Sequence, residues 1–136
     1  MRRIEGNEDG LTTALLRELK TRCPRLEVLH HRDITAGIPD LSITGYGRTT
    51  WWELKHARPT FKSCGIQRLR CRRLAAGGVC LYVLYHEGPN GKRTMIVHPM
   101  DIMTSLVNAN DVVWFEKTAG FDHAWVCDRV MDRHLT

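Results

Sequence analysis

The alternation of hydrophobic and polar residues predicts one helix followed by three strands over roughly the first 55 positions. Residues 8–22 carry leucines at positions 11, 15, 16 and 19, a spacing that places them on one side of a helix. Residues 26–32, 40–44 and 49–55 have the length and composition of strands. The glycine-rich stretch between the last two is typical of a turn that joins antiparallel strands.

The pattern further along predicts a second helix and two more strands. A helix over residues 64–76 is expected to end at Gly77-Gly78, because glycine commonly follows the last helical residue. Residues 79–85 form a continuous apolar run, which is typical of a central strand buried on both faces. A short strand over residues 93–97 follows.

Three later segments complete the expected secondary structure. Pro99 is suited to the first turn of a helix over residues 100–107. Residues 112–115 fit a strand, and residues 124–134 fit either a strand or a helix. The fold class expected from this order is α/β (α+β), with a mixed central sheet flanked by helices.

Length and composition favour a single soluble domain of 136 residues, with a core over residues 8–97 and a C-terminal extension over residues 98–136. No apolar run approaches the ~20 residues needed to cross a bilayer, so we expect no membrane association. The five cysteines are an odd, scattered set, which fits a reducing compartment and predicts a cytoplasmic protein.

The charge distribution points to a polyanionic partner. The chain has 20 Lys and Arg against 15 Asp and Glu, a net charge of +5. No acidic residue occurs between Leu54 and His86, and this stretch holds Lys55, Arg58, Lys62, Arg68, Arg70, Arg72 and Arg73.

Three charged residues in the predicted hairpin form the strongest candidate site. A turn centred between Tyr46 and Gly47 places Asp40 opposite Glu53. Directly opposed side chains have Cβ atoms ~4.5–5.5 Å apart, close enough for two carboxylates to share a divalent cation. Lys55 points to the same side of the strand as Glu53, because side chains alternate along a strand.

The first helix offers a third acid. Glu8 lies at the centre of the apolar side of this helix, whereas Glu18 lies at its margin and Glu5 precedes the helix. A carboxylate in that position either faces a polar site or is an ordinary first-turn acid favoured by the helix dipole.

These residues resemble a known family. The motifs are Gly37-Ile38-Pro39-Asp40, then Glu53-Leu54-Lys55, then Gln67 in a helix that ends Ala75-Ala76-Gly77-Gly78. Together they resemble the PD-(D/E)xK nuclease superfamily, with the greatest likeness to its VRR-NUC branch and to Holliday-junction resolvases. The likeness covers roughly residues 8–97.

The resemblance implies a restriction-endonuclease-like αβββαβ core that hydrolyses DNA phosphodiester bonds with Mg²⁺ or Mn²⁺. Asp40, Glu53 and the backbone carbonyl of Leu54 would hold the metal, and Glu8 would take the place of the family's helix acid. Lys55 would orient the attacking water, and Gln67 would lie near it. The resemblance also implies branched or otherwise structured DNA as substrate, a role in recombination or repair, and a homodimer.

Several residues are candidates for DNA contact, although polar strand ends and helix solvation explain them equally well. They are His31, Arg32, Arg58, Lys62, Arg68, Arg70, Arg72 and Arg73. Trp51 shares the parity of Glu53 and is a candidate for base stacking, but core packing is expected for both Trp51 and Trp52.

Three alternatives to a junction nuclease stay open. The first is a nicking, restriction or repair nuclease of the same fold, and the second is a DNA-binding protein of this fold without catalysis. The third is a structural or regulatory protein with no role in nucleic-acid chemistry.

Overall fold

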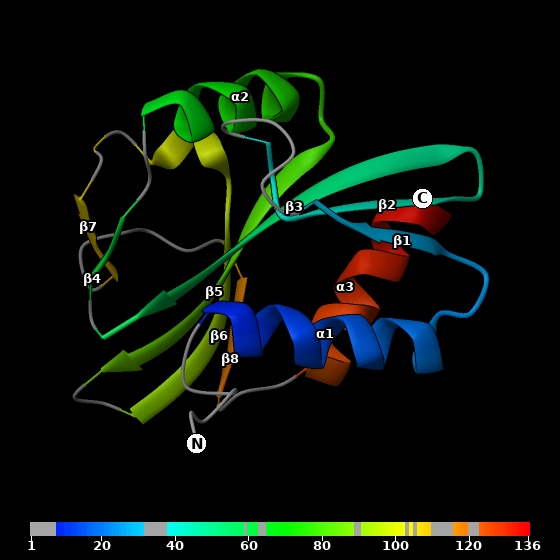
Figure 1. Cartoon of the computed structure of the whole chain (residues 1–136), viewed down its shortest axis with the longest axis horizontal. Helices are drawn as coiled ribbons and strands as arrows, with labels where there is room; N and C mark the ends of the chain where they lie inside the picture. The colour runs from blue at the N-terminus through cyan, green and yellow to red at the C-terminus, as the bar shows by residue number, and fades with distance from the viewer. Residues whose placement is uncertain are drawn as a thin grey trace.

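The computed structural model describes residues 8–31, 38–58, 60–62, 65–88, 91–102, 104, 106–109, 116–119 and 123–136. The fold is mixed α/β, with a sheet that has helices on both faces (Figure 1). Its sheet has six strands in the order β1-β2-β3-β5-β6-β8. The bounds are β1 Glu27–His30, β2 Leu41–Gly45, β3 Arg48–Ala57, β5 Cys80–Gly88, β6 Gly91–Val97 and β8 Glu116–Ala119.

The sheet is mixed because of a single parallel pair. Strands β3 and β5 run parallel, joined through helix α2 (Gly65–Ala76), and the other four neighbouring pairs are antiparallel. The first elements along the chain follow the expected order of a helix, three strands, a helix and a strand, except that the short strand β4 (Thr60–Lys62) intervenes before α2. The expected central strand is confirmed, since β5 lies between β3 and β6 and alternates its buried side chains between the two faces.

Helix α1 (Glu8–Arg22) begins and ends where the sequence pattern predicts. Its residues Leu11, Leu15 and Leu19 are buried, and Leu16 packs at the edge of the same cluster. This cluster fills the space between one face of the sheet and the pair α1 and α3 (His123–Leu135). The open choice for residues 124–134 is thus settled as a helix.

Helix α3 belongs to the main core, although the sequence assigns it to an extension. Its residues Val126, Cys127 and Val130 are buried beside the leucines of α1. A polar chain also holds it to the hairpin: Thr50 Oγ1 lies 2.9 Å from His134 Nε2, and His134 Nδ1 lies 3.0 Å from the carbonyl of Gly45.

The opposite face of the sheet is covered by α2 and by segments from the second half of the chain. Cys71 and Ala75 of α2 pack there with Tyr82 of β5 and Met95 of β6. A small two-stranded ribbon of β4 (Thr60–Lys62) and β7 (Leu106–Asn108), which the sequence pattern does not predict, contributes Phe61 and Val107.

The helix predicted for residues 100–107 is wrong. Only a single 3-10 turn, Pro99–Asp101, forms after the proline, and Ile102 is extended. The reason is tertiary: Ile102 and Val107 are 1% and 6% exposed and are buried in the cluster beneath α2. Val107 lies in β7, which pairs with β4, and Ile102 lies in the extended segment before it. In a helix, two residues five positions apart would lie about 140° apart, so both could not face the cluster. The strand predicted for residues 112–115 lies outside the described residues.

Candidate active site

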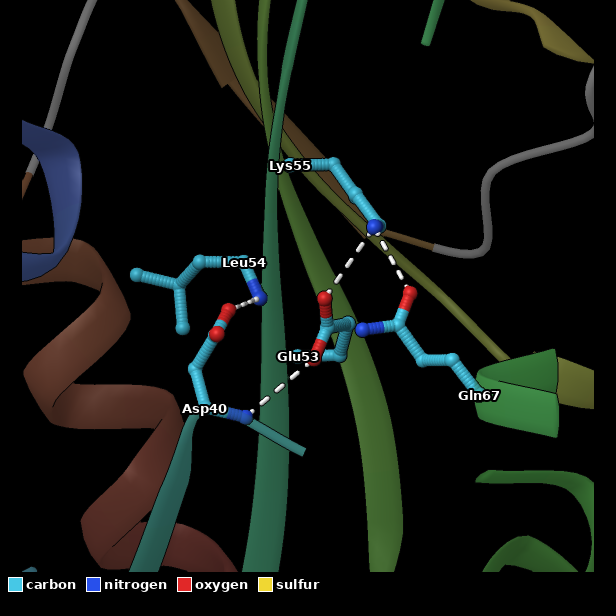
Figure 2. Close-up of polar contacts among 5 residues, drawn as sticks. All are labelled: Asp40, Glu53, Leu54, Lys55 and Gln67. Carbon is cyan, nitrogen blue, oxygen red and sulfur yellow. Dashed lines mark hydrogen bonds and ion pairs between the residues drawn. The ribbon is translucent and has the colours of Figure 1, made fainter. Parts of the chain in front are cut away.

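The β2–β3 hairpin positions the candidate acids as the sequence predicts. Tyr46 and Gly47 form the turn, both with positive φ (54° and 76°), and Leu41 pairs with Trp52. The strand pairing ends at this pair, and just beyond it the amide of Asp40 donates to Oε1 of Glu53 over 3.1 Å. The amide of Leu54 in turn donates to Oδ2 of Asp40 over 2.8 Å, so each carboxylate is bound by the backbone of the other strand (Figure 2).

Glu53, Lys55 and Gln67 meet on the face of the sheet that α2 covers. The ammonium group of Lys55 lies 3.1 Å from Oε2 of Glu53 and donates to Oε1 of Gln67 over 2.7 Å (Figure 2). Alternation along β3 places Glu53 and Lys55 on the same side, and Leu54 points to the other side, into the core with α1 and α3. The expected position of Gln67 near the candidate site is confirmed.

The charged groups of this cluster are almost fully withdrawn from water. Glu53 is 1% exposed and Lys55 is 6% exposed. Burial raises the pKa of Glu53 well above its usual value, and the nearby charge of Asp40 raises it further, against the opposing charge of Lys55. A divalent cation at this carboxyl would lower its pKa again, because an opposite charge favours the charged form.

The donor set fits a hard divalent cation. Two carboxylates on adjacent strands offer oxygen ligands, which Mg²⁺ and Mn²⁺ prefer, and a cation would offset the repulsion between Asp40 and Glu53. No group of three acidic, histidine or cysteine ligands is found within the described part of the chain. Glu8, the expected third ligand, is the first residue of α1, but its side chain lies outside the description.

His31 and Trp51 extend the site along the sheet. The backbone amide of His31 donates to the carbonyl of Asp40 over 2.8 Å, which places His31 directly across from the acid. Its ring stacks on Trp51, with centroids 5.3 Å apart and planes 29° apart, and its Nε2 lies 2.7 Å from Oγ of Ser42. Trp52 is buried in the core as expected, and Trp51 is half-buried and packs against the cluster beneath α2, as also expected.

Two residues lie behind the site that the sequence analysis did not identify. Their hydrophobic pattern is the same as that of ordinary core residues. Cys71 lies one turn after Gln67 in α2, and Tyr82 is the partner of Glu53 in the β3–β5 register. Hydrogen bonds from Cys80 and Tyr82 lower the pKa of the Cys71 thiol, and the charge of Lys55 acts in the same direction, against burial. The i, i+4 spacing of Gln67 and Cys71 is the one available clue that they share a helix face.

The candidate DNA-contacting residues divide into two groups. Arg68 and Arg72 are half-buried, whereas Arg70 and Arg73 are exposed on the outer side of α2. Arg58 follows β3 and Lys62 ends β4, and both are exposed. Arg32 lies outside the described residues.

Comparisons with known proteins add no identity to this geometry. No family model matches the chain, and a search of curated proteins produced no match. In the described part of the chain, no helix is long and apolar enough to span a membrane.

Proposed function

We propose that this protein is a metal-dependent endonuclease that hydrolyses phosphodiester bonds in DNA. The observation that carries the proposal is the row formed by Asp40, Glu53 and Lys55, in which the Glu53 carboxylate lies between the amide of Asp40 and the buried ammonium group of Lys55. The resemblance to the PD-(D/E)xK superfamily supports the same activity, with branched or structured DNA as substrate and a homodimer as the working form.

Each residue of the row has a chemical task in this proposal. Asp40 and Glu53 would hold Mg²⁺ or Mn²⁺, together with the backbone carbonyl of Leu54. When bound, the cation polarises a phosphoryl oxygen and lowers the pKa of a coordinated water. Glu8 supplies a further carboxylate from the start of α1.

Lys55 acts as a hydrogen-bond donor. Its ammonium group is paired with Glu53 and anchored by Gln67, so it is held where it can orient the attacking water or neutralise the scissile phosphate. In this proposal Lys55 contributes positive charge and hydrogen-bond donors.

Cleavage of defined DNA substrates tests the proposal. The purified protein is incubated with linear duplex, flap, fork and four-way-junction DNA, each with Mg²⁺ or Mn²⁺. We expect cleavage with the metal and none in EDTA, and we expect the structured substrates to be cut faster than the linear duplex.

Variants at the site and away from it complete the test. Asp40→Asn and Lys55→Ala should abolish cutting while DNA binding persists, whereas exposed controls, Asp101→Asn on the 3-10 turn and Lys20→Ala on α1, should cut normally. Wild-type protein that binds DNA but cuts no form with either metal would show a non-catalytic binding protein. The absence of any salt-sensitive DNA binding would rule out both.

A further inference from the structure

In the described part of the chain, no helix packs on the β1 and β2 part of the sheet face that carries the site. The cluster beneath α2 draws residues from β3, β5 and β6 and none from β1 or β2, as far as the described residues extend. The other face of the same two strands is covered, since Leu41, Ile43 and Val28 pack against α1 and α3. Figure 1 shows α2 above the central strands, while the outer part of the β2–β3 hairpin extends beyond it.

The uncovered part carries side chains that a buried face would not. Leu29 is 52% exposed, and Thr44 is also exposed, with its hydroxyl 2.8 Å from that of Thr49 across the hairpin. These residues lie on the same side of the sheet as Asp40, Ser42 and Trp51. Residues paired across two strands point to the same side, and so does every second residue along one strand. We call this surface, formed by Leu29, His31, Thr44 and Trp51, the open sheet face; Ser42, on the same side, is buried.

An aromatic stack stands where the open sheet face meets the site. His31 and Trp51 are stacked, and both backbones are hydrogen-bonded: the amide of His31 donates to the carbonyl of Asp40, and the amide of Trp51 donates to the carbonyl of Val79 over 2.6 Å. The ring of His31 is held by its contact with Ser42, and Trp51 packs against the cluster beneath α2. Rings fixed in this way lose little freedom when a further flat group is added to the stack.

The stack also has the right spacing from the reacting centre. Trp51 precedes Glu53 by two residues on the same side of β3, which separates their backbone positions by about 7 Å. His31 lies directly across from Asp40. A nucleotide whose phosphate is at the carboxylates therefore has its neighbour's base within reach of these rings.

We propose that the open sheet face binds an unpaired nucleobase next to the cut phosphate, by stacking on the His31–Trp51 pair. The inference rests on the proposed nuclease function and adds that the DNA strand is unpaired next to the cut phosphate. Nucleic acid fits better than a peptide because the neighbouring helix α2 carries four arginines and no acid. Any base can stack here, because every base has a π-face. The site is therefore expected to prefer DNA with locally unpaired bases and to show no preference for base sequence.

Abasic substitution measures this contact directly. A DNA oligonucleotide carrying one abasic nucleotide, moved stepwise along the strand, is titrated against the full chain in EDTA. We expect one position at which loss of the base weakens binding by wild-type protein roughly tenfold. At that position 2-aminopurine, a fluorescent base, should be quenched on binding.

Three variants separate stacking from other roles of His31. His31→Ala should bind the intact and abasic strands equally, whereas His31→Phe should keep the tenfold difference because the flat ring persists without the Ser42 contact. His30→Ala, a neighbour on the opposite side of β1, should behave as wild type. A wild-type abasic penalty that survives in His31→Ala, or no penalty at any position, overturns the inference.

Cleavage assays keep this result distinct from the proposed function. DNA cutting in Mg²⁺ without any abasic penalty refutes the stacking site and leaves the nuclease intact. A His31-dependent penalty without cutting under any metal refutes the nuclease and leaves a base-stacking DNA-binding surface. If the wild type binds no DNA, both are wrong.

Discussion

The ammonium group of Lys55 donates a hydrogen bond of 2.7 Å to the side-chain oxygen of Gln67, which joins strand β3 to helix α2 at the candidate site. The same ammonium contacts the carboxylate of Glu53. Lys55 therefore has one charged partner, Glu53, and one neutral partner, the side-chain amide of Gln67. Lys55 is thus fixed by two elements that are separate in sequence.

Gln67→Ala should slow cleavage about 10- to 100-fold while DNA affinity stays within a factor of two, because a displaced ammonium loses its alignment with the reacting phosphate. Single-turnover rates and equilibrium binding separate the two effects. Leu69→Ala, on the exposed side of the same helix, is the control and should cut normally. If both variants lost the same fraction of the cleavage rate, the cause would be a general disturbance of helix α2.

Glu53→Gln should raise thermal stability above neutral pH in EDTA, although it abolishes cleavage. The pKa of Glu53 is raised in the folded state, so the folded chain holds this proton more tightly than the unfolded chain does. Wild-type stability therefore falls as the pH rises from the ordinary value of 4.5 towards the raised pKa, and the uncharged variant escapes this loss.

Thermal melts from pH 4 to pH 9 check this prediction. The midpoints of wild type and Glu53→Gln should converge at the acidic end and separate as the pH rises. Mg²⁺ at 10 mM, on the order of typical working concentrations, should stabilise the wild type only, because ligands that bind the native state raise its stability. Glu18→Gln on the exposed surface of α1 should show neither effect. A gap that narrows with pH would contradict the assignment.

His134→Ala should destabilise the fold by about 2 kcal/mol, because it leaves a buried hydroxyl and a buried carbonyl without their partner. The carbonyl of Gly45 can only accept, so Nδ1 of His134 carries the hydrogen, and Nε2 accepts from Thr50. Thr50 in turn accepts from the indole of Trp52 over 2.8 Å. Urea unfolding measures the loss, and Leu135→Ala, which is 59% exposed, should change it by less than about 0.5 kcal/mol.

Replacing Arg70 and Arg73 together with glutamine should weaken DNA binding and flatten its salt dependence. Each phosphate contact contributes roughly 0.9 to the slope of log affinity against log salt, so two lost contacts should lower the slope by about 2. Arg17→Gln with Lys20→Gln removes the same charge from α1, on the other side of the sheet, and should leave the slope near that of the wild type. Equal changes in both pairs would indicate a general charge effect.

The candidate site was largely predictable because most of it is local. Asp40 and Glu53 lie on two strands joined by a tight turn, so the turn position sets their register, and strand alternation then adds Lys55. Gln67 was expected near the site from the family resemblance alone, and its contact with Lys55 depends on how α2 packs on the sheet. The spacing of residues in the sequence does not predict contacts between α2 and the sheet.

Errors in the prediction occur where short apolar segments fit more than one period. Residues 100–107 were expected as a helix because Pro99 suits a first turn, whereas the burial of both Ile102 and Val107 beneath α2 favours an extended segment. The unresolved choice at residues 124–134 has the same origin, and packing of Val126 and Val130 against α1 decides it in favour of the helix.

The sequence by itself determined which side chains share a strand face and which acids oppose each other, because both follow from the two-residue period of a strand and one turn. Only the tertiary structure decided that Glu53 and Lys55 are sealed from water while His31 and Trp51 stay partly open. Helix α2 covers part of that face and leaves the rest, and where a helix lies on a sheet depends on contacts between residues distant in the chain.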